Sequence, residues 1–156
     1  MEVVAINDLT DPANLAHLLK YDSVQRAFNG TVEHNGKHII VNGTKIIVLN
    51  EPDPAKLPWK DLNIDVVIES TGEFVDRKNA IKHVEQSGSK KVIISAPAKG
   101  ENNSVDYIVL GVNDEIINRN EVIISNASCT TNNVAPLIKI LDDNWGIEKG
   151  FITTVH

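Results

Sequence analysis

A cysteine and a histidine near the end of the chain are the residue types of a nucleophile and its base. Cys129 is the only cysteine, within the run Ser-Asn-Ala-Ser-Cys-Thr-Thr-Asn of residues 125–132, and His156 follows Thr-Thr-Val. A thiol with a histidine farther along the chain is a possible nucleophile and base pair. A lone cysteine can instead be a small buried hydrophobe. The hydroxyl and amide side chains around Cys129 favour a reactive thiol, because they would not line an apolar pocket.

The position of Cys129 between two expected elements supports the same chemistry. An apolar run, residues 121–124, predicts a strand that leads into the motif, and a helix-like stretch follows it. The positive end of a helix favours the thiolate form of a thiol placed there, and the thiolate is the nucleophile.

Composition narrows the class of protein. The chain has 156 residues, 42% of them hydrophobic, and suits one domain or a piece of a larger protein. Its net charge of −6 argues against a nucleic acid or an anionic membrane as partner. We expect no membrane span, no signal peptide, no disulfide and no metal site, and therefore a cytoplasmic protein.

Short runs rich in Val and Ile predict strands that are buried on both faces of a parallel sheet. The runs are residues 3–6, 66–68, 92–94, 107–110 and 122–124. Helices are expected over residues 12–20, capped by Asp11, and 77–86, capped by Asp76 and stopped by Gly88. This alternation predicts an α/β fold, a Rossmann-like doubly wound parallel sheet.

Two further segments complete the expected fold. Residues 31–50 predict an inserted antiparallel β-meander, because Asn35-Gly36 and Asn42-Gly43 are strong hairpin signals. After Cys129, apolar residues spaced on one face predict a helix that ends at Gly146 and becomes regular only after Asn132, since Pro136 suits a first turn or a kink. Residues 151–155 predict another strand.

Small polar residues follow the predicted strands where a parallel sheet binds ligands, outside the carboxyl ends of its strands. They are Asn7 and Asp8, then Ser70, Thr71 and Gly72 after Glu69, then Ser95, and finally residues 125–129. This alignment is what a nucleotide and a reacting group would need.

Asp8 has two possible roles. At a strand end it could hydrogen-bond a ribose 2′-hydroxyl, which would favour NAD over NADP, or it could be a turn residue before the helix at Asp11. No G-x-G-x-x-G loop occurs in the sequence. We expect the remaining histidines to be surface residues; these are His17, His34, His38 and His83.

The motif of residues 125–132 resembles the active-site motif of phosphorylating glyceraldehyde-3-phosphate dehydrogenases. Other stretches resemble the same family in the same order: Ala5 to Asp8, Leu19 to Ser23, Glu69 to Gly72, Ile94 to Pro97 and Thr153 to His156. The resemblance covers the whole chain.

The resemblance implies NAD-dependent oxidation of glyceraldehyde 3-phosphate to 1,3-bisphosphoglycerate in glycolysis. Cys129 would attack the aldehyde, and His156 would hold the thiolate and take the hydroxyl proton. Ser128 and Thr130 would contact substrate or inorganic phosphate. Asn7, Asp8, the turn of Ser70 to Gly72 and Ser95 would bind the cofactor.

The resemblance also implies an organisation in which this chain is an internal piece of a homotetrameric enzyme. Residues 1–128 would be the NAD-binding domain without its first strand and glycine loop. Residues 129–156 would begin the catalytic domain. By itself such a piece would be inactive.

Other functions remain open on the sequence alone. Erythrose-4-phosphate dehydrogenase shares the cysteine motif. A Cys-His acyl transferase or hydrolase would need no NAD, and a binding fragment would perform no catalysis. NAD binding and turnover separate these alternatives.

Overall fold

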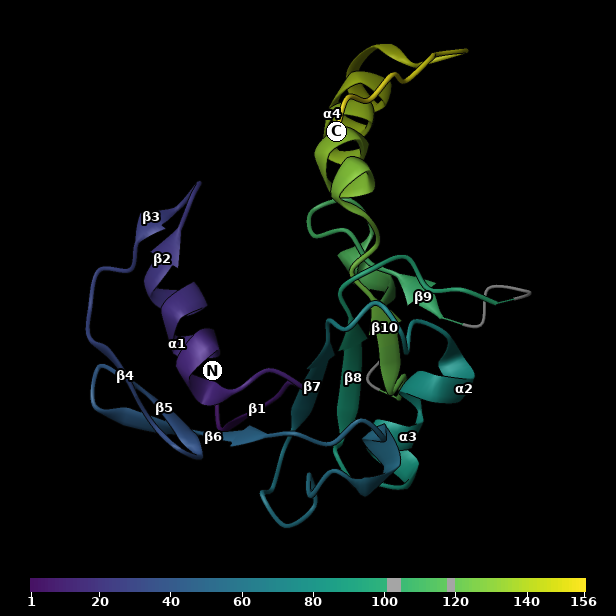
Figure 1. Cartoon of the computed structure of the whole chain (residues 1–156). Coiled ribbons are helices and arrows are strands. Elements are labelled where there is room, and N and C mark those ends of the chain that lie inside the picture. Colours follow the sequence, from purple (N-terminus) through teal and green to yellow (C-terminus); the bar gives the residue numbers. More distant parts are fainter. Residues whose placement is uncertain (101–104, 118–119) are drawn as a thin grey trace. The chain divides into compact units, whose positions relative to one another are not determined.

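The computed structural model describes residues 1–100, 105–117 and 120–156. The chain forms two compact units, Met1–Pro58 and Trp59–His156. Each unit contains its own four-stranded sheet (Figure 1). Within the described ranges, every helix is too short or too polar to cross a membrane.

The first unit combines a parallel strand pair with an antiparallel meander. Its sheet has the order β1-β6-β5-β4, in which β1 runs parallel to β6 and the other pairs are antiparallel. The strands are β1 (Ala5–Asn7), β4 (Val32–Asn35), β5 (His38–Val41) and β6 (Thr44–Leu49). The predicted meander is confirmed, and β1 belongs to the same sheet as the meander.

The turn between β5 and β6 explains why the meander was readable from sequence. Val41 pairs with Thr44, so the loop contains only Asn42 and Gly43. Both have positive φ, 50° and 83°, as a hairpin turn that matches the strand twist requires. Asn and Gly adopt this conformation at the lowest cost.

Helix α1 (Pro12–Lys20) begins as its sequence predicts. The Asp11 carboxylate accepts hydrogen bonds from the backbone N–H groups of Ala13 and Asn14, at 2.9 and 3.0 Å. Pro12 occupies the first helical position, where a missing N–H costs nothing. A short hairpin of β2 (Tyr21–Asp22) and β3 (Arg26–Ala27) follows, which the sequence pattern does not predict.

The second unit contains an entirely parallel sheet, with the order β7-β8-β10-β9. Its strands are β7 (Val66–Glu69), β8 (Lys91–Ile94), β9 (Asp106–Tyr107) and β10 (Ile123–Ser125). Val92, Ile94 and Ile123 are almost completely buried and form the centre of its core. The α/β class is thereby confirmed.

The helix predicted over residues 77–86 is broken in the middle. It forms as α2 (Arg77–Ala80) and α3 (Lys82–Glu85), separated at Ile81. Asp76 caps α2 by accepting a hydrogen bond from Asn79 N at 3.0 Å, and Gly88, with φ of 85°, follows α3. The expected cap and stop are confirmed, and the continuous helix is not.

Helix α4 (Cys129–Trp145) projects from the end of β10 (Figure 1). It is helical from Cys129 onward, earlier than predicted, with Pro136 inside it, and it ends at Gly146 as expected. Its large apolar side chains from Leu137 onward are exposed in this chain, Trp145 to 76%.

The strand predicted over residues 151–155 does not form. These residues form no regular secondary structure and are exposed, and no strand pairs with them among the described residues. A strand without a hydrogen-bonded neighbour is not stable, so the β-rich sequence alone does not produce one.

Candidate active site at the carboxyl edge of the parallel sheet

Three loops start at the same level along the carboxyl edge of the second unit's sheet. Glu69 of β7 pairs with Ile94 of β8, and Ile94 pairs with Ser125 of β10. The segments that follow these residues therefore leave the sheet side by side. They contain Ser70, Thr71 and Gly72; Ser95; and residues 126–129.

The turn after β7 is held by the side chain of Glu69. One carboxylate oxygen, Oε1, accepts hydrogen bonds from Thr71 N at 2.7 Å and from Thr71 Oγ1 at 2.5 Å. The Thr71 hydroxyl in turn accepts from Glu73 N at 3.1 Å. Gly72 has φ of 76°, which a glycine adopts without strain. Ser70, Thr71 and Gly72 are exposed, as a ligand-binding turn must be.

Glu69 itself is buried and belongs to a chain of polar side chains. Its other oxygen, Oε2, lies 3.0 Å from His83 Nε2, and Trp59 Nε1 donates to His83 Nδ1 at 3.0 Å. Burial of Glu69 opposes ionisation, but the hydrogen bonds from His83 and Thr71 outweigh it and hold the pKa of Glu69 below its usual range.

His83 is only 3% exposed, so the expectation that it is a surface residue was wrong. The signal was present in the sequence. Ala80 and His83 are three residues apart and share the inner face of the broken helix, and a carboxylate, Glu69, ends the half-buried strand β7.

The loop that leads to Cys129 is tied to the neighbouring strand. The buried Ser125 hydroxyl donates to Ala96 O at 2.7 Å and accepts from Ala127 N at 3.1 Å. The backbone N–H of Asn126 donates to Ile94 O at 2.8 Å. These bonds fix the path of the chain between the end of β10 and the start of α4.

The first turn of α4 is closed by its own side chains. Ser128 is the N-cap, and its Oγ accepts a hydrogen bond from Thr131 N at 3.0 Å. The Asn132 amide donates to Asn126 O and Ser128 O, at 2.7 and 2.9 Å. The polar residues that suggested a reactive thiol therefore build the backbone that carries it.

Cys129 is a free, exposed thiol at the first position of α4. It lies at the N-terminal, positive end of a seventeen-residue helix. Thr130 follows it and is half-buried.

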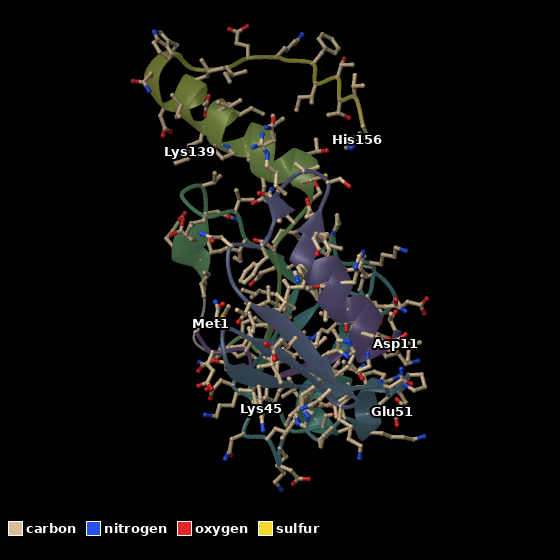
Figure 2. The ribbon with its side chains drawn as sticks, turned by 60° about the vertical axis from the view of Figure 1, so that its left-hand side comes forward. Met1, Asp11, Lys45, Glu51, Lys139 and His156 are labelled. Atoms are coloured by element: carbon tan, nitrogen blue, oxygen red, sulfur yellow. The ribbon has the colours of Figure 1, made fainter. Side chains whose placement is uncertain are left out.

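His156 is at the end of the extended segment that follows α4 (Figure 2). Its Nε2 lies 3.1 Å from the Thr154 hydroxyl, and the ring is exposed. The structure gives His156 this local partner instead of the Cys129 thiol. Its pairing with Cys129 stays a prediction.

Two predicted cofactor residues belong to the first unit, at the carboxyl end of β1. The Asn7 amide exchanges two hydrogen bonds with the Glu51 backbone, at 2.9 and 3.0 Å, so its side chain joins the ends of β1 and β6. Asp8 accepts from Thr10 N through Oδ1 at 2.8 Å. Among the described residues no donor is bonded to Asp8 Oδ2, which leaves that oxygen for a ligand hydroxyl.

Two stretches of the chain match models of known protein families. Residues 1–77 match the model "Glyceraldehyde 3-phosphate dehydrogenase, NAD binding domain", and residues 128–156 match the C-terminal domain of the same family. Together the two matches cover more than half of the chain. The chain belongs to the glyceraldehyde-3-phosphate dehydrogenase family.

Individual glyceraldehyde-3-phosphate dehydrogenases are similar over the whole chain. The enzyme of Thermotoga maritima is 56% identical over 156 residues, which is 100% of this chain and 46% of that protein. That of Clostridium acetobutylicum is 54% identical over the same shares, and that of Borreliella burgdorferi 52% identical over 47% of its length. The chain thus spans about half the length of the curated relatives it matches.

The two family matches divide the candidate residues between them. Asn7, Asp8 and the turn of residues 70–72 are within the stretch that matches the NAD binding domain of glyceraldehyde-3-phosphate dehydrogenases. Ser128, Cys129, Thr130 and His156 are within the stretch that matches the C-terminal domain. Ser95 is between the two stretches.

Ala127 provides a test of how tightly the loop before Cys129 is specified. It has φ of 56° and is 2% exposed. A left-handed conformation costs an L-residue about 1–2 kcal/mol, more when the residue is β-branched. We expect Ala127→Gly to change the unfolding temperature of the full-length protein little, and Ala127→Val to lower it clearly and to slow alkylation of Cys129. Equal unfolding temperatures and alkylation rates for the two variants would show that the loop adapts freely.

Proposed function

We propose that the protein containing this chain is an NAD-dependent phosphorylating dehydrogenase of glyceraldehyde 3-phosphate. The observation that carries the proposal is the placement of Cys129. It is an exposed thiol at the N-terminus of a long helix, on the same sheet edge as an exposed Thr71-Gly72 turn, in a chain of this family. An NAD-independent acyl transferase or hydrolase is not favoured, because it would leave the NAD binding domain without a role.

The residues present fit a nicotinamide dinucleotide. Asp8 has a carboxylate oxygen free of protein donors among the described residues, which suits the hydroxyls of a ribose. Thr71, Gly72 and the exposed Ser95 offer backbone and hydroxyl groups at a sheet edge where ligands bind. Within the first unit, Asn7 would support Asp8 by holding the end of β1 to the Glu51 backbone. NAD, when bound, supplies acceptance of a hydride from the substrate.

Cys129 performs the covalent chemistry in this proposal. Its thiolate sulfur forms a bond to the aldehyde carbon, and the carbonyl oxygen takes the proton of the His156 imidazolium that held the thiolate, becoming the hydroxyl of a thiohemiacetal. His156 accepts the hydroxyl proton as the carbon is oxidised, which leaves a thioester on Sγ. Inorganic phosphate then attacks the thioester carbon, the C–S bond breaks, and Cys129 leaves as thiolate. The products are 1,3-bisphosphoglycerate and reduced cofactor.

The other residues predicted near Cys129 would bind phosphate groups. Ser128 and Thr130 flank the sulfur in sequence and would bind the phosphate groups of substrate or inorganic phosphate. We further propose that residues 1–128 belong to the NAD-binding domain and that Cys129 begins the catalytic domain. The full protein would be cytoplasmic, since a free catalytic thiol persists in a reducing compartment. It would also be a homotetramer, as the family resemblance implies.

The nucleophile is tested directly by Cys129→Ser in the full-length protein. A serine hydroxyl remains protonated and is a poor nucleophile without a matched base, so we expect turnover to fall by more than about a thousand-fold. NAD affinity, measured by calorimetry, should stay within about twofold, because Cys129 follows β10 and the cofactor residues belong to other loops. Substantial turnover by Cys129→Ser would refute the proposal.

Cofactor choice is tested at Asp8. Asp8→Asn keeps an acceptor for Thr10 N but removes the charge that disfavours a 2′-phosphate. A lost hydrogen bond to a charged group corresponds to about a ten- to hundred-fold weaker interaction, so the ratio of NAD to NADP efficiency should fall at least about tenfold. Asp11→Asn, at the neighbouring helix cap, is the matched control and should leave this ratio unchanged. If Asp8→Asn behaves like the control, Asp8 is a turn residue only.

A further inference from the structure

The buried polar chain Trp59–His83–Glu69 is not used by the proposed chemistry. The three residues come from the segment before β7, from α3 and from the end of β7, and they are 5%, 3% and 4% exposed. Burying three polar side chains in the core of a small sheet is costly unless every polar atom is paired. Here the pairing is complete, and it ends at an exposed turn of the candidate site.

In the hydrogen-bonded series Trp59–His83–Glu69, the chemistry of each group decides which atom donates and which accepts. The indole N–H of Trp59 can only donate, so His83 Nδ1 is the acceptor. A ring that accepts at Nδ1 carries its proton on Nε2, and His83 therefore donates to Glu69 Oε2. Thr71 donates to Glu69 Oε1 from both its backbone N–H and its hydroxyl. Three donors converge on one carboxylate.

Glu69 also connects two loops of the candidate site. The backbone carbonyl of Glu69 accepts a hydrogen bond from Ser95 N at 3.0 Å, while its side chain holds Thr71. Movement of the carboxylate would therefore change the turn that contains Thr71 and Gly72. Glu69 itself is too deeply buried to touch a ligand.

We propose that Glu69 is a positioning residue for the cofactor. Its carboxylate holds the Thr71-Gly72 turn in its binding conformation, and Trp59 and His83 hold the carboxylate. This inference rests on the proposed function, because it assigns the exposed turn to NAD.

The neutral isostere cannot replace the carboxylate. In Glu69→Gln, the amide NH₂ can point at His83 Nε2, but that nitrogen carries a proton and is itself a donor. The proton cannot move to Nδ1, because Nδ1 accepts the hydrogen bond of Trp59. The flipped amide instead directs its NH₂ at the backbone N–H of Thr71. In both orientations two donors face each other in a buried site, so the turn must shift or the histidine must lose its bond to Trp59.

The test compares Glu69→Gln with wild type in the full-length protein. We expect the Kd for NAD, measured by calorimetry, to rise by at least about tenfold, the scale of one mismatched buried hydrogen bond. At saturating NAD, kcat for glyceraldehyde 3-phosphate should change less than about twofold, and so should the alkylation rate of Cys129 without NAD, because Cys129 is held by other loops. An unchanged Kd, or equal losses in kcat and alkylation, would overturn the proposal.

A matched control separates positioning from stability. Ser89 is buried, and its hydroxyl donates to the backbone carbonyl of His83 at 2.8 Å. Ser89→Ala removes a buried hydrogen bond in the same region without touching the carboxylate. It should lower the unfolding temperature and leave the Kd for NAD unchanged. If it weakens NAD as much as Glu69→Gln does, the effect is one of general stability and the proposal is wrong.

A double variant tests the direction of the bonds even if Glu69→Gln folds poorly. When Trp59→Phe is combined with Glu69→Gln, His83 is free to carry its proton on Nδ1 and to accept at Nε2 from the introduced side-chain amide. NAD affinity should then be closer to wild type than in Glu69→Gln, and additive losses would contradict the argument. Wild-type protein that fails to bind NAD would instead defeat the proposed function itself.

Discussion

The candidate site depends on the register of the parallel strands β7, β8 and β10, whose last residues pair with one another. Because Glu69, Ile94 and Ser125 pair in one row, the segments that follow β7, β8 and β10 leave the sheet at one edge. Parallel strands all present their carboxyl ends at the same edge, so small polar residues that are far apart in sequence meet there. A one-residue slip of β10 would turn Ser125 to the other face and break its bond to Ala96.

Two devices convert this edge into a site of defined shape. The buried Glu69 carboxylate fixes the turn after β7 from inside the core. Ser125, Ser128 and Asn132 fix the path from β10 into α4 through bonds to backbone groups. The thiol of Cys129 is thus placed by residues that do not react, while its own side chain is exposed.

The sequence predicted those features that depend on neighbouring residues. The Asn42-Gly43 turn, the Asp11 and Asp76 caps and the Gly146 stop are local in origin, and each formed as expected. The burial of His83 was missed: its spacing from Ala80 places it on the inner helix face, but its partners Trp59 and Glu69 are distant in sequence. The strand over residues 151–155 needed a partner that the described residues do not provide. The roles of His156 and of the cofactor residues depend on contacts with a cofactor and a substrate, which neither the sequence pattern nor the chain's own hydrogen bonds reveal.

The central claim is that Cys129 carries the substrate during turnover. The direct measurement mixes the full-length protein with glyceraldehyde 3-phosphate and NAD without inorganic phosphate, quenches in acid, and maps the peptides by mass spectrometry. If Cys129 is the nucleophile, its peptide carries a 3-phosphoglyceroyl group, in an amount equal to the NADH formed, that disappears when phosphate is added. NADH formation with Cys129 unmodified would show that another group carries the substrate.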